Sequence, residues 1–365
     1  MDSTSLHRIS MRQRGRSGFT MIELLIAIVI ASMVVTGLYT LFTVQTRQFL
    51  YQDLQMEIHQ NQRFATDIIT RSVRMAGYGT SGRVVGYLGH SDDTDNDLPV
   101  VMSYDAWTGG DGSDAITVVY GDSALALATN SSFLANCETT ELQFPAGVRD
   151  YGERLGEYVA DEMIMCMDYA SLGGMRTYLW VISSPPTASG SMGVYDGTSN
   201  ADFVGACPVG ENISPAMYCS KAQVMTFYID ADDGVPGPGT SEKPVLMLDL
   251  NLNWPSDDDI PLVENVEDMQ FEYCLLDADG DGNIDDCSDS AATWVDSITT
   301  DQGSAVQMVR MHLLVRSSRE DPGDLYQNSQ PSLANHSVSA DPDGYYRQVL
   351  TTEVTVRNLR AQANL

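Results

Sequence analysis

Basic residues are scarce in this chain. Its 365 residues hold 20 Lys and Arg against 50 Asp and Glu, and Lys221 and Lys243 are the only lysines. The formal net charge is −30 at pH 7. A protein that binds the phosphate backbone of a nucleic acid needs the opposite sign, so this function is excluded. The acidic surface favours solubility and binding of divalent cations, and a solvated acidic coat is the alternative.

The residues that enzymes use for catalysis are also few. The sequence contains no GxSxG, HExxH or P-loop motif. Aspartates are clustered, but no nucleophile or general base accompanies them. His312 lies opposite the apolar positions of an expected strand, which is typical of a sheet surface. We therefore expect a protein that is not an enzyme. The five histidines are His7, His59, His90, His312 and His336.

The chain contains no CxxC motif and no paired Cys and His spacing of a zinc site. An even number of dispersed cysteines indicates disulfides and an oxidising compartment. The six are Cys137, Cys166, Cys207, Cys219, Cys274 and Cys287.

A long uncharged run extends from Leu24 to Thr46. As a helix it would be about 34 Å long, enough to cross a bilayer core of about 30 Å. Residues 1–18, which precede the run, contain four arginines and one acid, Asp2. This asymmetry predicts that Met1 stays in the cytoplasm and that the rest of the chain is exported.

The residues before this run argue against a simple membrane anchor, which is the alternative. The segment Gly18-Phe19-Thr20-Met21-Ile22-Glu23 places a single carboxylate at the edge of the apolar helix, where a charge without a partner is costly. The junction resembles the class III signal of type IV prepilins. The resemblance implies cleavage between Gly18 and Phe19 by prepilin peptidase and N-methylation of Phe19. It also implies that Glu23 pairs with the N-terminal ammonium of a neighbouring subunit.

The helical pattern continues beyond the membrane span. Apolar residues recur at steps of three, four and seven, which indicates an amphipathic helix. Gly77 reads as its C-terminal cap. These residues are Leu50, Leu54, Ile58, Ala65, Ile68 and Ile69. We predict a leader peptide over 1–18, one long helix over 19–76, of which 19–46 is the transmembrane or filament-core part, and a β-rich head over 77–365. The GxGxxG match at Gly77–Gly82 follows a helix and enters a loop, so it is not a dinucleotide site.

Beyond residue 83, strand patterns alternate with turn residues and no clear helix pattern recurs. Strands are expected over 115–120, 163–167, 177–182 and 224–229. Three more strands in the last third form an antiparallel meander whose apolar face can cover the helix. The predicted fold class is therefore α+β. In each of these three strands, alternate residues share one face. They are Met269, Phe271, Tyr273 and Leu275 in the first strand, Val309, Met311, Leu313 and Val315 in the second, and Leu350, Thr352, Val354 and Val356 in the third.

Several later segments resemble PilW-type minor pilins. They are Arg63-Phe64-Ala65, Arg74-Met75-Ala76-Gly77-Tyr78, Val266-Glu267-Asp268-Met269-Gln270-Phe271-Glu272-Tyr273, Leu313-Leu314-Val315-Arg316-Ser317 and Thr351-Thr352-Glu353-Val354-Thr355-Val356-Arg357-Asn358. The resemblance implies the type IV pilin fold. Residues 83–220 carry no segment that resembles this family.

An acidic loop in the head has the pattern of a calcium site. Carboxylates stand at positions 1, 3, 5 and 9 with a glycine at position 6, and hard oxygen ligands on alternate residues suit Ca²⁺. Position 12 is Ser288 and no helix flanks the loop, so it is not an EF-hand. The expected ligands are Asp277, Asp279, Asp281, Asn283 and Asp285, with Asp286 as a further ligand.

Disulfides are expected between cysteines that lie close in sequence. Cys274 and Cys287 flank the acidic loop, and their pairing would close it. Proximity also favours Cys207 with Cys219 and Cys137 with Cys166. Two further acidic segments, 93–97 and 230–234, repeat only part of the calcium pattern and are expected to be solvated loops.

These features predict a minor pilin that takes part in priming or assembly of a type IV pilus at its tip. Before assembly it would be a single-pass inner-membrane protein with a periplasmic head, and afterwards it would be extracellular. Expected partners are other minor and major pilins, prepilin peptidase and a large tip adhesin. A minor pseudopilin of type II secretion is the first alternative. A calcium-dependent tip adhesin, binding through residues 83–220, is the second.

Overall fold

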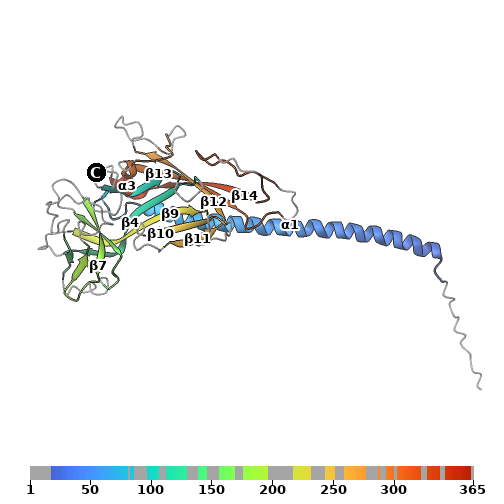
Figure 1. Ribbon diagram of the computed structural model, residues 1–365, viewed down its shortest axis with the longest axis horizontal. Coiled ribbons are helices and arrows are strands. Elements are labelled where there is room, and N and C mark those ends of the chain that lie inside the picture. The colour runs from blue at the N-terminus through green and yellow to red at the C-terminus, as the bar shows by residue number, and fades with distance from the viewer. Residues whose placement is uncertain are drawn as a thin grey trace, which may run out of the picture. The chain divides into compact units, whose positions relative to one another are not determined.

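The computed structural model describes residues 18–80, 83–85, 97–106, 112–129, 139–145, 156–168, 176–195, 217–231, 243–250, 259–276, 287, 293–299, 302–321, 327–337 and 342–362. The fold is α+β, as predicted, with one long N-terminal helix and sheets whose described strand pairs are antiparallel except for one (Figure 1). The chain divides into two compact units, Met1–Asp53 and Leu54–Leu365, and the boundary lies inside the helix.

Helix α1 extends from Met21 to Met75. In the first unit its apolar side chains are exposed, whereas in the second unit Leu54, Ile58, Ala65 and Ile69 are buried. The buried residues belong to the face that the sequence periodicity predicts, so the amphipathic half of the helix packs as expected. One polar residue on this face, Gln62, is also buried and donates from Nε2 to the carbonyl of Gln348 at 2.9 Å.

The C-terminal end of α1 is fixed by the other end of the chain. Gly77 adopts a φ of +76°, the left-handed conformation that a helix cap requires. The side-chain amide of Asn358 donates to the carbonyls of Met75 and Ala76, each at 3.2 Å. Asn358 belongs to a short helix, α3 (Arg357–Gln362). The expectation that no helix follows the first is wrong here, because six residues are too few for a periodic pattern.

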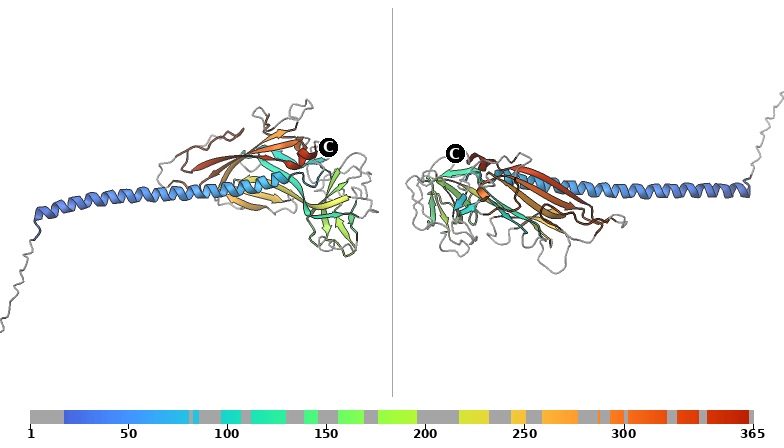
Figure 2. Two further views of the ribbon diagram at one scale, coloured as in Figure 1. Left: turned by 180° about the vertical axis from the view of Figure 1, so that it is seen from behind. Right: turned by 90° about the horizontal axis from the view of Figure 1, so that it is seen from above.

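The last three long strands form the predicted meander. They are β12 (Val266–Leu275), β13 (Val306–Arg316) and β14 (Arg347–Thr355), in the order β12-β13-β14 and all antiparallel. The register places Phe271 opposite Met311, and Met311 opposite Thr352. The residues predicted to share a face are therefore aligned across the sheet, and the prediction is confirmed. Figure 2 shows the three strands, coloured from orange to red, side by side.

The remaining strands form a second, larger sheet with the order β11-β10-β9-β6-β7-β1-β2. Strand β4 also pairs with β9 and carries β3, whereas β8 pairs with β7 and carries β5. The strands are β1 (Arg83–Val85), β2 (Asp97–Pro99), β3 (Val101–Tyr104), β4 (Ala115–Ala128), β5 (Glu141–Gln143), β6 (Met163–Asp168), β7 (Arg176–Ser184), β8 (Ser191–Val194), β9 (Met217–Asp230), β10 (Val245–Leu250) and β11 (Ile260–Glu264).

Two hydrophobic clusters form the core of the second unit. The larger joins Ile58 and Ile69 of α1 with side chains from both sheets, such as Phe227 and Phe271. The smaller contains Ile164 and Trp180. Every residue of β6 is buried, and neighbouring residues of this strand belong to different clusters. The larger sheet is therefore covered on both faces at β6. The smaller cluster, which covers one of these faces, is formed by residues within 83–220.

Candidate functional site

The predicted processing junction immediately precedes α1. Gly18, Phe19 and Thr20 lie outside the helix, and the Phe19 side chain is 84% exposed. Thr20 Oγ1 accepts the Glu23 amide at 3.3 Å, and Glu23 Oε2 accepts the Thr20 amide at 3.5 Å. This reciprocal pair is a capping box, and it starts the helix just after the Gly18–Phe19 peptide bond. The bond is therefore in exposed, non-helical chain, as a peptidase requires.

The role of Thr20 was not predicted, although the T-x-x-E spacing of Thr20 and Glu23 is the sequence signature of a capping box. The carboxylate of Glu23 also lies in the first turn of the helix, where the macrodipole favours a negative charge. Thr20 and Glu23 together thus define where the helix begins.

The first unit has the properties of a membrane-spanning helix. By length and composition α1 is the one helix among the described residues that could cross a membrane. Its hydroxyl groups are satisfied within the helix: Ser32 donates to the Val29 carbonyl, Thr36 to Ser32 and Thr40 to Thr36, at 2.8 to 2.9 Å. These bonds lower the cost of placing polar side chains in lipid, so the hydroxyl-bearing residues are compatible with the apolar run.

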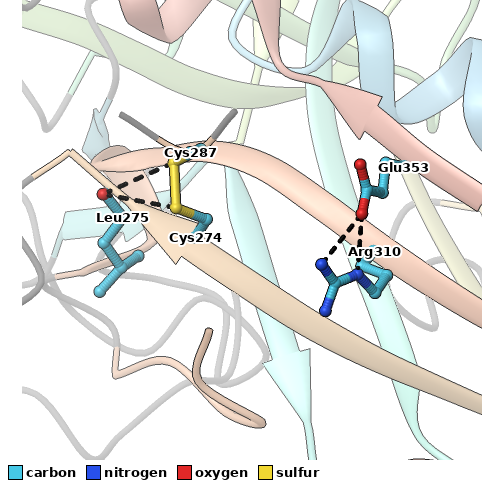
Figure 3. The surroundings of a disulfide bond; sticks show 5 residues. All are labelled: Cys274, Leu275, Cys287, Arg310 and Glu353. Atoms are coloured by element: carbon cyan, nitrogen blue, oxygen red, sulfur yellow. Dashed lines mark hydrogen bonds and ion pairs between the residues drawn. A yellow bond between two sulfur atoms is a disulfide. The ribbon is translucent and has the colours of Figure 1, made fainter. Parts of the chain in front are cut away.

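The predicted calcium ligands Asp277, Asp279, Asp281, Asn283, Asp285 and Asp286 lie outside the described residues. The two ends of the loop are described. A disulfide joins Cys274, in β12, to Cys287, with the Cα atoms 5.9 Å apart (Figure 3). This pairing agrees with the sequence prediction, and it closes the acidic segment into a loop whose ends are buried. Among the residues that are described, no group of three or more His, Cys, Asp or Glu side chains is arranged to bind a metal.

The other two expected disulfides are wrong. Cys166 is bonded to Cys219, not to Cys137, and Cys219 is therefore not bonded to Cys207. The physical reason is strand pairing, because β6 and β9 are antiparallel neighbours that place Cys166 directly opposite Cys219. Proximity in sequence predicts a pairing only when no sheet brings distant cysteines together. Cys137 and Cys207 lie outside the described residues.

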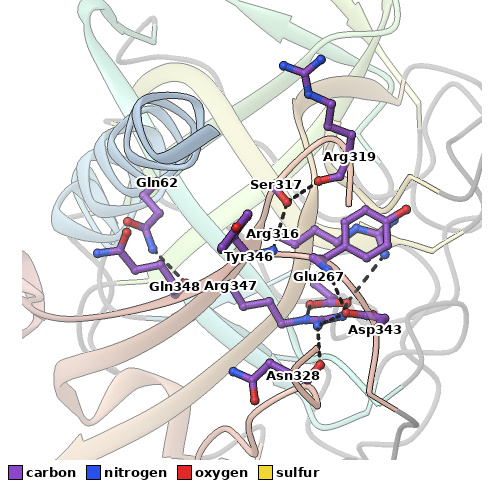
Figure 4. Close-up of polar contacts among 11 residues, drawn as sticks. Gln62, Glu267, Arg316, Ser317, Arg319, Asn328, Asp343, Tyr346, Arg347 and Gln348 are labelled. Atoms are coloured by element: carbon purple, nitrogen blue, oxygen red, sulfur yellow. Dashed lines mark hydrogen bonds and ion pairs between the residues drawn. The ribbon is translucent and has the colours of Figure 1, made fainter. Parts of the chain in front are cut away.

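A cluster of ion pairs holds one end of the C-terminal sheet. Arg347 pairs with Glu267, with its Nε 2.6 Å from Oε2, and with Asp343, with Nη2 2.6 Å from Oδ2 (Figure 4). Burial raises the pKa of Asp343, but hydrogen bonds from Arg347 and the Tyr345 amide outweigh it and lower the pKa below its usual value. Arg316 also lies 3.7 Å from Glu267. The arrangement is structural, since every charge in it has an opposite partner.

His312 and His336 make structural contacts in the head. His312 Nε2 lies 3.0 Å from Glu272, on the face of the sheet opposite the apolar side chains, as expected. His336 Nδ1 lies 2.8 Å from Asp268, and Ser113 donates to the other oxygen of Asp268 at 3.0 Å. Ser113 and His336 thus both bond to the buried carboxylate, which leaves the serine without the general base that a nucleophile needs. The sequence patterns did not predict that Ser113, Asp268 and His336 lie close together.

Comparison with known proteins agrees with both ends of this architecture. Residues 226–358 match the family model of type IV pilus-assembly protein W, PilW, and residues 13–39 match the prokaryotic N-terminal methylation motif. The chain is thus similar to PilW over its C-terminal part and to prepilin-like proteins at its N-terminus. The PilW match extends from within β9 through β14 into α3, and it includes the C-terminal meander. No curated protein and no solved structure matches the chain significantly.

These two matches bear on the coarse function. Together they support a pilin related to type IV pili. Its apolar helix and methylation motif are those of a membrane-anchored pilin.

Proposed function

We propose that this chain is a minor pilin, cleaved between Gly18 and Phe19, N-methylated on Phe19, and incorporated at low abundance near the tip of a type IV pilus. Before assembly the head would lie in the periplasm, and afterwards it would be exposed outside the cell. Its partners would be prepilin peptidase, other minor and major pilins, and a large tip adhesin. Its contribution would be assembly rather than catalysis.

One observation carries this proposal. The Gly18–Phe19 bond lies in exposed chain, two residues before a capped helix whose first half is apolar and exposed. Cleavage there leaves the membrane helix intact and gives it a new N-terminal ammonium. In an apolar filament core, this ammonium and the carboxylate of Glu23 in an adjacent subunit would neutralise each other. The PilW match supports a pilus over a general membrane anchor.

The test is mass spectrometry of filaments sheared from cells. We expect a peptide beginning with N-methylated Phe19, in trace amounts relative to the main pilus subunit. A Gly18→Val variant should remain uncleaved and absent from filaments. Gly37→Ala is the matched control. A Cβ at either glycine has no atom within 4 Å, so neither substitution disturbs the packing of the described residues.

The other outcomes separate the alternatives. Abundance equal to that of the main subunit would make this chain a structural pilin. Methylated Phe19 found only in the membrane fraction would favour a minor pseudopilin of type II secretion. Binding of the isolated chain to host cells or abiotic surfaces without other pilins would favour a tip adhesin. An uncleaved chain beginning at Met1 would contradict the prepilin proposal altogether.

We further propose that the acidic loop binds Ca²⁺ and that the ion stabilises the head. Asp277, Asp279, Asp281, Asp285 and Asp286 would supply carboxylate oxygens and Asn283 its carbonyl, a donor set of the hard kind that Ca²⁺ prefers. The Cys274–Cys287 disulfide supports this because it joins the two ends of the loop and limits its freedom before the ion binds.

A further inference from the structure

A groove lies beside the exposed face of α1 within the second compact unit. Its volume is about 430 Å³. One wall consists of Glu57, Gln60 and Phe64, which follow one another at helical spacing on α1, and the other wall includes Leu262, Glu264 and Asn265 around the turn between β11 and β12. None of these six residues belongs to the processing junction or to the acidic loop.

The walls combine an aromatic ring with negative charge. Phe64 is 52% exposed, which is unusual for so large an apolar side chain in a packed head. The carboxylates of Glu57 and Glu264 lie on opposite walls. Glu57 already accepts the hydroxyl of Ser318 at 2.8 Å, and Glu264 lies 3.3 Å from Lys243, in a pair that is exposed on both sides. Each carboxylate retains further acceptor capacity, since an ionised carboxylate accepts about four hydrogen bonds.

The buried side of the groove adds a further acceptor. Asn265 is 2% exposed, and its Oδ1 has no hydrogen-bond partner among the described residues. Its backbone is held in place, because its amide donates to the Pro244 carbonyl at 2.7 Å and its carbonyl accepts the Arg316 amide at 2.9 Å. The partial negative charge of Oδ1 is therefore offset by no hydrogen-bond donor among the described residues. All three groups favour a cation in the groove.

We propose that this groove receives an arginine or lysine side chain of a neighbouring pilin subunit. The aliphatic stem of the side chain would pack on Phe64 and Leu262, and the charged end would lie between the two carboxylates. An aromatic face and paired carboxylates are the surroundings in which a partly desolvated cation binds best. The groove is open to solvent, so it fits a side chain presented by a protein surface better than a small free cation. This inference rests on the proposed pilin function.

The test uses the full-length chain in piliated cells. Phe64 is replaced by the photoreactive analogue p-benzoylphenylalanine, and the same analogue at Arg71, whose side chain is 78% exposed on the same helix, is the control. We expect irradiation to join position 64 to another pilin at a peptide that contains Arg or Lys. In the Glu57→Gln/Glu264→Gln background the yield should fall roughly tenfold. Asp67→Asn, which removes one exposed helix charge, should leave it unchanged.

Glu57→Gln retains an acceptor for Ser318, so the double variant is expected to fold, and normal recovery of processed chain verifies this. The inference would be overturned if the crosslink yield were the same with and without the two glutamates. It would also be overturned if position 64 were joined only to lipid or to a second copy of this chain. The same cells are analysed for methylated Phe19 in sheared filaments. If methylated Phe19 is found but position 64 forms no crosslink, the groove proposal alone is refuted. If methylated Phe19 is absent from the filaments, the proposed function itself is refuted.

Discussion

At the scale of single residues, buried polar side chains determine how the head responds to pH. Asp114 is fully buried, and its two oxygens accept the amides of Phe271 at 2.9 Å and Ala106 at 3.2 Å. The pKa of Asp114 is raised to about 7, and burial is the largest cause. The hydrogen bonds from the two amides lower the pKa, whereas the negative charges of Asp105 and Asp268 raise it further.

The raised pKa fixes the sign of a pH dependence. The pKa in the folded state lies above the ordinary value of 3.8. The bound proton therefore stabilises the folded state fully below pH 3.8, and this stabilisation is lost as the pH rises through 7. From pH 6 to pH 8 the free energy of unfolding should fall by about 1.4 kcal/mol because of this residue. Asp114→Asn should remove that part of the slope in melts at several pH values. An unchanged slope would show that Asp114 does not titrate in this range.

Asn358 provides the second prediction at this scale. Its amide satisfies carbonyl groups at the end of α1 that have no partner in the helix. Asn358→Ala should therefore lower the free energy of unfolding of the head by about 1 to 2 kcal/mol and expose the end of the helix to limited proteolysis. Arg357→Ala, at the exposed neighbouring position, is the control and should change neither. Equal effects from both variants would contradict a capping role.

At the scale of elements, strand β9 connects the parts of the head. It pairs with β10 near one end, with β6 near the other, and with β4 along its length. The Cys166–Cys219 disulfide reinforces the pairing of β6 with the first residues of β9, and β9 then continues into the part of the chain that matches PilW. Much of the second hydrophobic cluster depends on this junction, because both cysteines belong to it.

This arrangement predicts the effect of removing the bridge. A Cys166→Ser/Cys219→Ser double variant should lose about 2 to 4 kcal/mol of stability, the range expected for a disulfide that closes a loop of this size. Peptide mapping without reduction should recover a Cys166–Cys219 peptide and a Cys274–Cys287 peptide. Recovery of a Cys207–Cys219 peptide instead would mean that β6 and β9 are not paired as described.

At the scale of the whole molecule, the net charge bears on the proposed calcium site. A net charge of −30 repels itself in the folded state, and a bound cation at the acidic loop would reduce that repulsion locally. We expect Ca²⁺ to raise the melting temperature of the head, and Asp279→Ala to abolish this increase. Asp67→Asn, which removes an exposed helix carboxylate, is the control and should retain it. A melting temperature that does not respond to Ca²⁺ would rule out the calcium proposal.

Features that arise from local chemistry could be predicted from the sequence alone. The methylation motif around Gly18 and Phe19 depends on a few consecutive residues, and the apolar span depends on composition. The faces of β12, β13 and β14 follow from a period of two, and the buried face of α1 follows from a period of 3.6. The Cys274–Cys287 bridge was predictable because only twelve residues separate its ends.

The features that depend on contacts between residues far apart in sequence could be seen only in the tertiary structure. Cys166 and Cys219 are 53 positions apart and meet because two strands pair. Asn358 reaches Met75 across 283 positions. Asp114 acquires its environment from β12, and the groove beside Phe64 requires the turn at Asn265 to lie against α1. No local periodicity encodes these meetings, because they depend on the packing of whole elements around a shared core.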